Sequence, residues 1–567
     1  MSSQSVVLRH PSIGPIHGLD RGNGVHQFLG IQYATLQDRL AEAQLKTTYQ
    51  TPVDATNYGP SSFSPPNGFD NETRLFIQQP LPQPPTVHSD LNCLNLNITV
   101  PASSDSTKRL PVFIWTHGGG FVVGANSWPH YDHARVVRLA AEHGIPVIGV
   151  GINFRLGLPG LLTSEELRQK GYKSNNLLHD QRTAFQWVKQ HIAGFGGDPD
   201  IITVIGESTG AVATTLHLYS QQKLFNRAIA TGGSCLLIPL FSPEDHERTY
   251  QQVLSILGLA ELGPGERIQR LLSMPMDEII ARLPPSVALL PMIDGDIIPQ
   301  RPTYVTIADK EDRSMPGKQW AEGLMIGDSQ FDASAPNIIA SPLWPIVHTM
   351  SSTLATMMAH LKPNIRKRFS ASIRNSLSTT TPNVAEALLE AYGFNSPALA
   401  DPAADDEAAF LRFLHFANDI GYYAATISFG SGWPSSSSPS SSKALVFFFN
   451  EPNPWPGPFQ GQATHVLDVV FLFQNLNDKF PPAQRAAAEG FALDLMAFVS
   501  GKTPWNPYTP WARTAKVFGP SLTDAVTKVV ADAESVETGR RATILELGKQ
   551  VGLDKLAQAF GRFNMGL

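Results

Sequence analysis

The segment Gly206 to Gly210, with the sequence GESTG, is the feature that most constrains how this chain folds. It follows the apolar, β-branched run at residues 201–205 and precedes the apolar run at residues 211–219. We expect a buried strand, a sharp turn and a helix packed on a sheet, because β-branched residues favour strands and the glycines relieve crowding at the turn. Such a turn presents a hydroxyl at the N-terminus of the helix, so Ser208 is a candidate nucleophile.

Strand and helix patterns alternate through the first 240 residues. Strands are predicted at residues 112–115 and 147–150, and helices at 131–143 and 178–192. This alternation is typical of βαβ units and predicts an α/β fold with a mostly parallel central sheet flanked by helices. No internal repeat is found, and we treat residues 1–567 as a single domain.

The second half of the chain is more helical. Amphipathic spacing predicts cap-like helical insertions at about residues 241–312 and 345–425, separated by a short strand at 323–326. The Ser/Pro-rich stretch at 433–443 is predicted to be an exposed loop, because its side chains offer little to pack. The tail from residue 481 is predicted to be mostly helical.

Composition and charge indicate which binding partners and which cellular compartment to expect for this chain. The 567 residues include 43 Lys and Arg against 49 Asp and Glu, with no basic block, which argues against nucleic acid and anionic membrane surfaces. No apolar run approaches the ~18 residues of a membrane-spanning helix, and the N-terminus lacks the pattern of a secretory signal. The two cysteines, Cys93 and Cys235, make a disulfide framework unexpected. We therefore expect a cytoplasmic protein with a small-molecule partner, whose oligomeric state the sequence does not indicate.

A nucleophilic serine needs a general base and hydrogen-bond donors for the oxyanion that it generates. Donors are predicted in the glycine-rich segment HGGGF at residues 117–121, which follows a predicted strand. Backbone N–H groups of such a loop face the substrate carbonyl, and side chains there would block its approach. A plain flexible turn is the alternative interpretation.

The base is expected to be a histidine that follows the serine and the acid in the chain. Four histidines come into question: His348, His360, His415 and His465. The first three lie in or near apolar, mostly helical stretches, where histidine is usually a packed core residue. His465 lies instead in a loop after the strand-forming run ALVFFF, where catalytic residues concentrate. We predict that His465 is the base.

A carboxylate must orient the imidazole and stabilise its charged form. Asp328 and Asp332 both follow the predicted strand at 323–326, and they are equivalent on position alone. Four other carboxylates are given turn or accessory roles because of their positions: Asp294, Asp296, Glu207 and Asp468.

Four motifs together resemble the type-B carboxylesterase and lipase family of the α/β-hydrolase fold, which also contains the cholinesterases: HGGGF, FGGDPDIITVIGESTGA, GDSQFD and ATHVLD. The likeness covers almost the whole chain, from VHQFLGIQYA near the start to FVSGKTPW in the tail. It implies that Ser208 is the nucleophile and His465 the base. The family acid comes five residues after a glycine that ends a strand, and counting from Gly327 favours Asp332 over Asp328.

The resemblance also implies that the backbone N–H groups of Gly119, Gly120 and Thr209 form the oxyanion hole. Thr209 stands where the family usually has alanine, and it adds bulk beside the nucleophile. Asp332 stands where many members have glutamate, a change that is compatible with a triad. Cys93 matches half of a disulfide found in secreted members, but no second cysteine lies near the expected partner position, which supports an intracellular member.

These residues predict a serine hydrolase that acts on a carboxylic ester, with an apolar small-molecule substrate and without a cofactor. His130 and His133 lack further ligand spacing, so we interpret them as surface polar residues and predict no metal site. A lactonase, thioesterase or acyltransferase of specialised metabolism or detoxification is the alternative. A catalytically silent binding protein on the same fold is less favoured, because all three triad positions are filled.

Overall fold

The computed structural model describes most of the protein. The described residues are 4–22, 24–83, 85–102, 108–331, 361–377, 382–434, 442–457, 459–530 and 540–564. Some predicted features lie outside them: Asp332, His348, His360 and residues 435–441 of the predicted exposed loop. At the ends of that loop, Trp433 is buried and its indole N–H donates to Ser442 Oγ at 2.7 Å.

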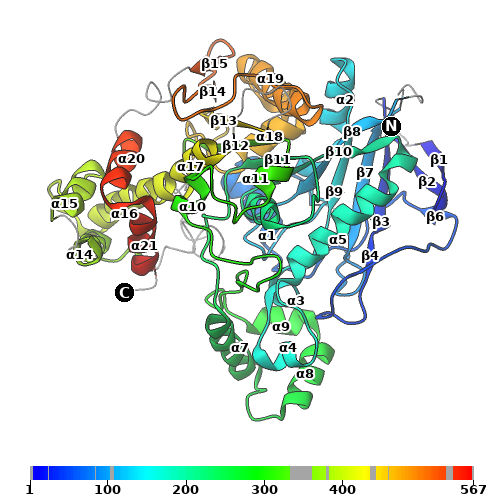
Figure 1. The fold of residues 1–567 in the computed structure, drawn as a ribbon, viewed down its shortest axis with the longest axis horizontal. Helices are drawn as coiled ribbons and strands as arrows, with labels where there is room; N and C mark the ends of the chain where they lie inside the picture. Colours follow the sequence, from blue (N-terminus) through cyan, green and yellow to red (C-terminus); the bar gives the residue numbers. More distant parts are fainter. Residues whose placement is uncertain are drawn as a thin grey trace.

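A 13-stranded mixed sheet lies at the centre of the described structure (Figure 1). Its middle is parallel, in the order β9-β8-β10-β11-β12-β13-β14. In that order the strands are Ile148–Ile152, Leu110–Thr116, Gly197–Glu207, Arg227–Thr231, Gly323–Ser329, Lys443–Phe449 and Ala515–Phe518. Parallel neighbours need crossover connections, which helices supply here, so the predicted α/β class is confirmed.

Antiparallel strands extend both edges of this sheet. One edge continues through β7 (Asn95–Pro101), β3 (Val25–Gln32), β2 (Gly14–Asp20) and β1 (Gln4–His10), and the other ends with β15 (Thr527–Val530). The sequence analysis did not predict these edges. The tail contains the expected helices, but it also contains β14 and β15. Strand β15 could not be predicted from a pattern, because its residues are largely exposed and show no alternation between a buried and an exposed face.

Alternate residues of the central strands point to opposite faces of the sheet. In β8, Val112 and Ile114 belong to one hydrophobic core, whereas Phe113 and Trp115 belong to the other. All four are fully buried. Burying an aliphatic or aromatic side chain of this kind contributes about 1.5–3 kcal/mol to the free energy of folding. Helices of the first core include α5 (Asn176–His191) and α6 (Thr209–Leu216), and those of the second include α2 (Ala134–Glu142), α18 (Leu467–Phe473) and α19 (Pro482–Val499).

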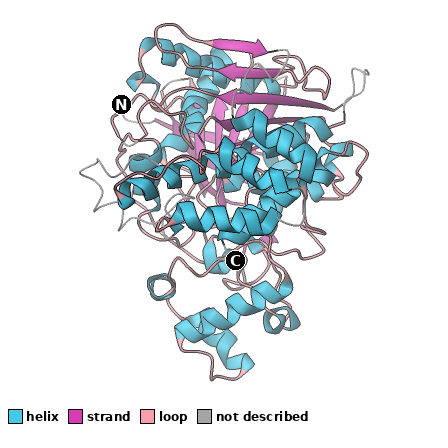
Figure 2. Cartoon of the chain, turned by 90° about the vertical axis from the view of Figure 1, so that its left-hand side faces the viewer, coloured by secondary structure: helices cyan, strands magenta, loops and turns pink. Residues whose placement is uncertain are grey.

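A lobe of short helices lies at the bottom of Figures 1 and 2, away from the sheet. It contains α7 (Pro243–Leu257), α8 (Pro264–Ser273) and α9 (Met276–Arg282), which share a separate small core. Ser242 caps the start of α7 through its side chain, and Gly258 ends it at a φ of 73°. These helices fall within the first range predicted as a cap insertion.

A second group of helices lies at the left of Figure 1 and includes the C-terminal pair. It is formed by α14 (Ile365–Leu377), α15 (Pro382–Ala391), α16 (Pro402–Asn418), α20 (Arg540–Val551) and α21 (Leu553–Asn564). The first three fall in the second range predicted as a cap insertion, and the C-terminal pair packs against them. None of the helices in the described ranges has the length and apolar character that crossing a membrane requires.

A buried ion pair attaches helix α20 to the end of strand β12. Arg541 Nη2 lies 2.6 Å from Asp328 Oδ2, and both side chains are buried. The neighbouring Arg540 Nε lies 2.9 Å from Asp419 Oδ2. Asp328, one of the two acid candidates, therefore has a role in holding α20 against the sheet.

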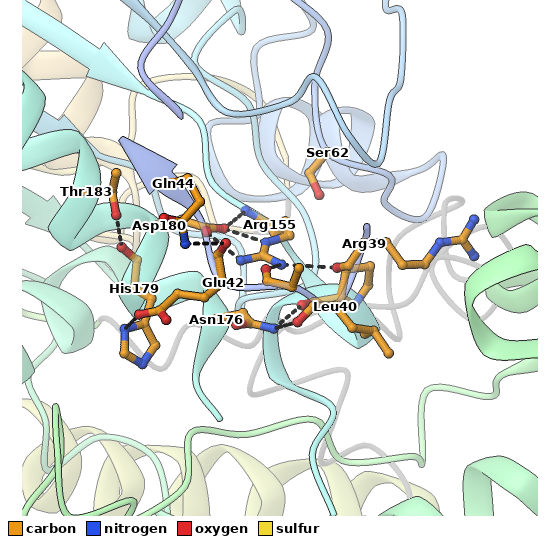
Figure 3. Close-up of polar contacts among 12 residues, drawn as sticks. Arg39, Leu40, Glu42, Gln44, Ser62, Arg155, Asn176, His179, Asp180 and Thr183 are labelled. Carbon is orange, nitrogen blue, oxygen red and sulfur yellow. Dashed lines mark hydrogen bonds and ion pairs between the residues drawn. The ribbon is translucent and has the colours of Figure 1, made fainter. Parts of the chain in front are cut away.

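Another buried ion pair joins the loop after β9 to helix α5 (Figure 3). The Arg155 guanidinium donates to both carboxylate oxygens of Asp180 at 2.7 and 2.9 Å, and to the carbonyls of Arg39 and Ala41 at 3.1 and 2.7 Å. Burial opposes the charge on Arg155, but Asp180 outweighs this effect, so the pKa of the guanidinium is raised. The loop fixed in this way carries Phe154, which contacts the glycine-rich segment.

Replacing Asp180 by asparagine tests how much this ion pair contributes to the stability of the fold. Asp180→Asn leaves the Arg155 charge buried without its counter-ion, so the free energy of unfolding should fall by about 3–5 kcal/mol. Urea unfolding of the purified proteins measures this difference. The exposed pair of Arg374 and Glu386 supplies the control, since Glu386→Gln should change the stability by less than about 1 kcal/mol. Equal effects of the two substitutions would contradict the account.

Candidate active site

Ser208 occupies the turn between strand β10 and helix α6 that the sequence predicted. Its φ of 55° and ψ of −125° are a combination that residues with a side chain rarely adopt. The Ser208 N–H donates to Thr231 O at 3.1 Å, which fixes the turn to the end of β11. Residues 202–207 and 209–220 are buried, whereas Ser208 between them is partly exposed. The strained turn therefore brings one hydroxyl out of an otherwise buried strand and helix.

Glycines allow three backbone segments to meet at this turn. A Cβ on Gly206 would lie 2.2 Å from Gly210 O, and a Cβ on Gly210 would lie 2.1 Å from Thr116 O. A Cβ on Gly118 would lie 2.9 Å from Ser208 Cβ. All three distances are shorter than van der Waals contact, so only glycine lets the glycine-rich segment lie against the Ser208 turn.

Contacts with two other parts of the chain hold the glycine-rich segment that follows β8. The ring of His117 stacks on Phe154, with the ring centres 4.5 Å apart. The N–H of Gly157 donates to Phe121 O at 2.8 Å. On the other side, the N–H of Phe121 donates to Thr209 Oγ1 at 3.2 Å. The segment is thus fixed between the loop after β9 and the start of α6.

Three backbone N–H groups in these segments are available to a ligand. Among the described residues, no acceptor engages the N–H of Gly119, of Gly120 or of Thr209. Gly119 and Gly120 have φ values of +100° and +66°, and a Cβ on Gly119 would lie 2.1 Å from Val123 O. Amide N–H groups without an acceptor next to a serine are the donors that an oxyanion needs.

His465 lies next to the same turn although it is far from Ser208 in the sequence. It comes after strand β13, just before helix α18, and its Nε2 lies 3.1 Å from Glu207 Oε1. Both side chains of this contact are buried. Phe76 and Tyr422 contact the imidazole edge-on, with ring centres 6.1 and 5.9 Å away. The sequence analysis gave Glu207 only an accessory role and did not predict that it contacts the histidine.

The segment before His465 pairs with the segment that follows strand β12. Phe331 and Thr464 form an isolated parallel bridge, and the N–H of Phe331 donates to Ala463 O at 3.0 Å. Asp332 itself lies outside the described residues. Its predecessor in the chain is therefore the direct neighbour of the residue that precedes His465.

Other residues considered in the sequence analysis have different environments. Asp328 is paired with Arg541, as described above. Asp294 Oδ1 accepts the N–H of Asp296 at 3.0 Å, which confirms the predicted turn role of these two residues. His415 lies within helix α16, and burial lowers its pKa to about 4.

The prediction that His130 and His133 are surface polar residues is wrong, because both are buried. His130 Nε2 lies 2.7 Å from Glu72 Oε1, and the hydroxyl of Tyr131 donates to the same oxygen. His133 packs against the ring of Phe113. The local sequence does not reveal that these histidines are buried, because their partners come from distant segments. In the part of the chain that the structure describes, no group of three or more His, Cys, Asp or Glu side chains could hold a metal ion.

The burial of His117, in the glycine-rich segment, makes the free energy of unfolding of the protein depend on pH. Burial lowers the pKa of His117 from 6.5 to about 4, so the folded state keeps the imidazole neutral. Protonation of the ring therefore favours the unfolded chain. The stability that the neutral His117 contributes is fully present above pH 6.5 and is lost as the pH falls from 6.5 towards 4.

His117→Gln removes this titration while the other buried histidines remain. Between pH 6.5 and about 4, its free energy of unfolding should fall less steeply than that of the wild type, by up to ~1.4 kcal/mol per pH unit. Urea unfolding at a series of pH values measures both slopes. Identical slopes would show that the ring is not buried in its neutral form.

Comparisons with known proteins place this geometry in context. A profile of the carboxylesterase family matches residues 3–513. The chain is 31% identical over 313 residues to the inactive carboxylesterase-like protein VdtD of Byssochlamys spectabilis, which covers 50% of each chain. It is 28% identical over 389 residues to lipase 2 of Diutina rugosa, covering 62% of this chain and 69% of the lipase. It is 34% identical over 262 residues to the para-nitrobenzyl esterase of Bacillus subtilis strain 168, covering 45% of this chain and 49% of that one.

The matched stretches span about half the length of the first and third of these relatives. Solved structures match over more of the chain. A PNB esterase superposes with a TM-score of 0.67 over 94% of this chain and 98% of its own, at 22% identity. A thermophilic PNB esterase gives a TM-score of 0.69 over 95% and 99%, at 21% identity. At this level of identity the likeness shows the fold, and it confirms the predicted α/β-hydrolase fold.

Proposed function

The chain belongs to the carboxylesterase family, and on this basis we propose that it hydrolyses carboxylic esters with Ser208 as the nucleophile. One observation carries the proposal. Ser208 has a strained backbone, is partly exposed between buried neighbours, and lies against a glycine-rich segment in which the amides of Gly119 and Gly120 have no acceptor among the described residues. The similarity to a para-nitrobenzyl esterase and to a lipase supports the same chemistry.

The proposed reaction proceeds through an acyl-enzyme. Ser208 Oγ attacks the ester carbonyl while His465 accepts its proton. The N–H groups of Gly119, Gly120 and Thr209 donate to the oxyanion of the tetrahedral intermediate. The intermediate collapses, and the alcohol leaves with the proton from His465. A water molecule, deprotonated by the same histidine, then attacks the acyl group and releases the acid together with a free Ser208.

We assign the third triad position to Asp332. The pairing of Phe331 with Thr464 supports this assignment, because these two residues directly precede Asp332 and His465 in the chain. Glu207 has an accessory role in the proposal. Its carboxylate lies 3.1 Å from His465 Nε2, so we propose that it helps to hold the imidazole in place beside the Ser208 turn.

We propose that the ester carries an apolar group. The aromatic rings of Phe76 and Tyr422 beside His465 support this choice, because apolar lining with a few polar groups is typical of small-molecule sites. A lactone or a thioester would react by the same steps. An acyltransferase would differ only in the acceptor that replaces water.

A catalytically silent binding protein is the second candidate. The observation in its favour is the 31% identity to a protein named as inactive. Against it, this chain has a serine at position 208 and a histidine at position 465, and His465 lies 3.1 Å from Glu207, the residue that precedes Ser208. Turnover separates the two candidates.

Hydrolysis of p-nitrophenyl esters of graded acyl length tests the proposal. Ser208→Ala and His465→Gln should each lower kcat on the order of 10⁶-fold, because the two residues act as a unit. Asp332→Asn should lower it by roughly 10⁴-fold, because the imidazole then loses its orienting carboxylate. The chain-length optimum would give the first measure of the pocket depth.

Asp328→Asn is the matched control for the acid, and it should retain kcat within about tenfold if the purified protein is folded, because it lacks a triad role. A large loss in Asp328→Asn together with an active Asp332→Asn would move the acid to Asp328. Absence of turnover by folded wild-type protein with every ester would favour the silent candidate. Turnover that survives Ser208→Ala would contradict the proposed nucleophile.

A further inference from the structure

The side chain of Thr209 joins the two segments that meet at the proposed active site. Its Oγ1 accepts the N–H of Phe121 at 3.2 Å, and Thr209 is only 5% exposed, so water does not compete for this bond. Thr209 directly follows Ser208 at the start of helix α6. Phe121 directly follows Gly119 and Gly120. The bond therefore ties the nucleophile turn to the proposed oxyanion donors.

Phe121 needs this partner for two reasons. It is 1% exposed, so its N–H would be buried without an acceptor if the threonine hydroxyl were absent. It also has a φ of 62°, a conformation that is unfavourable for a residue with a bulky side chain. Such a conformation persists only when the surroundings hold it, and the hydroxyl of Thr209 is part of those surroundings.

Other bonds hold the segment from a different direction. The N–H of Gly157, in the loop after β9, donates to Phe121 O at 2.8 Å, and the N–H groups of Val122 and Val123 donate to Gly119 O at 3.1 and 3.0 Å. These bonds fix the shape of the segment. The bond to Thr209 fixes its distance from the Ser208 turn.

We propose that the Thr209 hydroxyl is a positioning group for the oxyanion hole, an inference that rests on the proposed function. It holds the amides of Gly119 and Gly120 at the distance from Ser208 Oγ at which they meet the developing oxyanion. Hydrogen bonds weaken steeply as distance and angle depart from their optimum, and the negative charge exists only after the attack. A displaced segment therefore weakens binding of the transition state more than binding of the ester, so kcat falls and KM stays nearly constant.

Three substitutions at one position separate the hydroxyl from the bulk of the side chain. Thr209→Val keeps the shape and removes the hydroxyl, Thr209→Ser keeps the hydroxyl and removes the methyl group, and Thr209→Ala removes both. The backbone N–H of residue 209 is present in all of them. The effect of the hydroxyl is therefore measured without loss of a direct donor.

Steady-state hydrolysis of p-nitrophenyl acetate by the folded variants is the test. Loss of one oxyanion donor costs roughly 10²–10³ in kcat, so misplacement of two donors in Thr209→Val should lower kcat about 10- to 100-fold, with KM changed less than about threefold. Thr209→Ser should recover most of the lost kcat, and Thr209→Ala should resemble Thr209→Val. The midpoint of the acidic limb of the pH profile should be unchanged in Thr209→Val, because the substitution removes no charged or titrating group.

Each other outcome overturns the inference. Wild-type kcat in Thr209→Val would show that the hydroxyl positions nothing, and equal losses in Thr209→Ser and Thr209→Val would assign the effect to the methyl group or to packing. A rise in KM alone would indicate a contact with the ester, and a shifted pH midpoint would indicate a disturbed His465. If the folded wild type hydrolyses no p-nitrophenyl ester of the graded series, the proposed function fails and the inference fails with it. An active wild type with an unaffected Thr209→Val refutes the inference alone.

Discussion

The close approach of backbone segments around Ser208 is the constraint on which the rest of the site depends. Strands β8 and β10 are parallel neighbours, with Thr116 opposite Gly206 at their ends. The next residues of both strands therefore leave the sheet at the same edge and next to each other. Only glycine fits at Gly118 and Gly210, because a Cβ there would collide with the opposite segment. The register of the sheet and the absence of these side chains together bring a strained serine and a row of amides into contact.

Two buried ion pairs that lie outside the site hold the loops on which this contact depends. The Arg155–Asp180 pair fixes the loop after β9, and that loop holds the glycine-rich segment through Phe154 and Gly157. Further along the sheet, Arg541 of helix α20 is paired with Asp328 at the end of β12. The same end of β12 leads into the segment that pairs with the residues before His465. A charge buried without its partner is costly, so both pairs restrict where these loops can lie.

The sequence was sufficient where a local pattern carries the information. The GESTG motif, with its β-branched run before it and its apolar run after it, predicted the strand, turn and helix around Ser208. His465 was selected by its place after a strand, and it does lie beside the residue that precedes Ser208. Asp332 was selected by the spacing of a related family, and its role stays a prediction.

The sequence was insufficient where a contact joins distant segments. Nothing near Glu207 in the sequence indicates its contact with His465, and nothing near His130 indicates its buried partner Glu72. The exposed strand β15 shows no alternation that a pattern could detect. The sequence showed the threonine at position 209 only as added bulk, because its hydrogen bond depends on the position of Phe121, which lies in the segment after strand β8.

The measurement that tests the central claim most directly is peptide mapping by mass spectrometry after reaction with a fluorophosphonate, which modifies activated serines. The account predicts one phosphonyl adduct per chain, located on Ser208, because among the serines that the structure describes this one combines the strained turn with adjacent amide donors and a nearby histidine. The same treatment of Ser208→Ala should give no adduct. An adduct on a different serine, or an unmodified Ser208 in folded wild-type protein, would contradict the account.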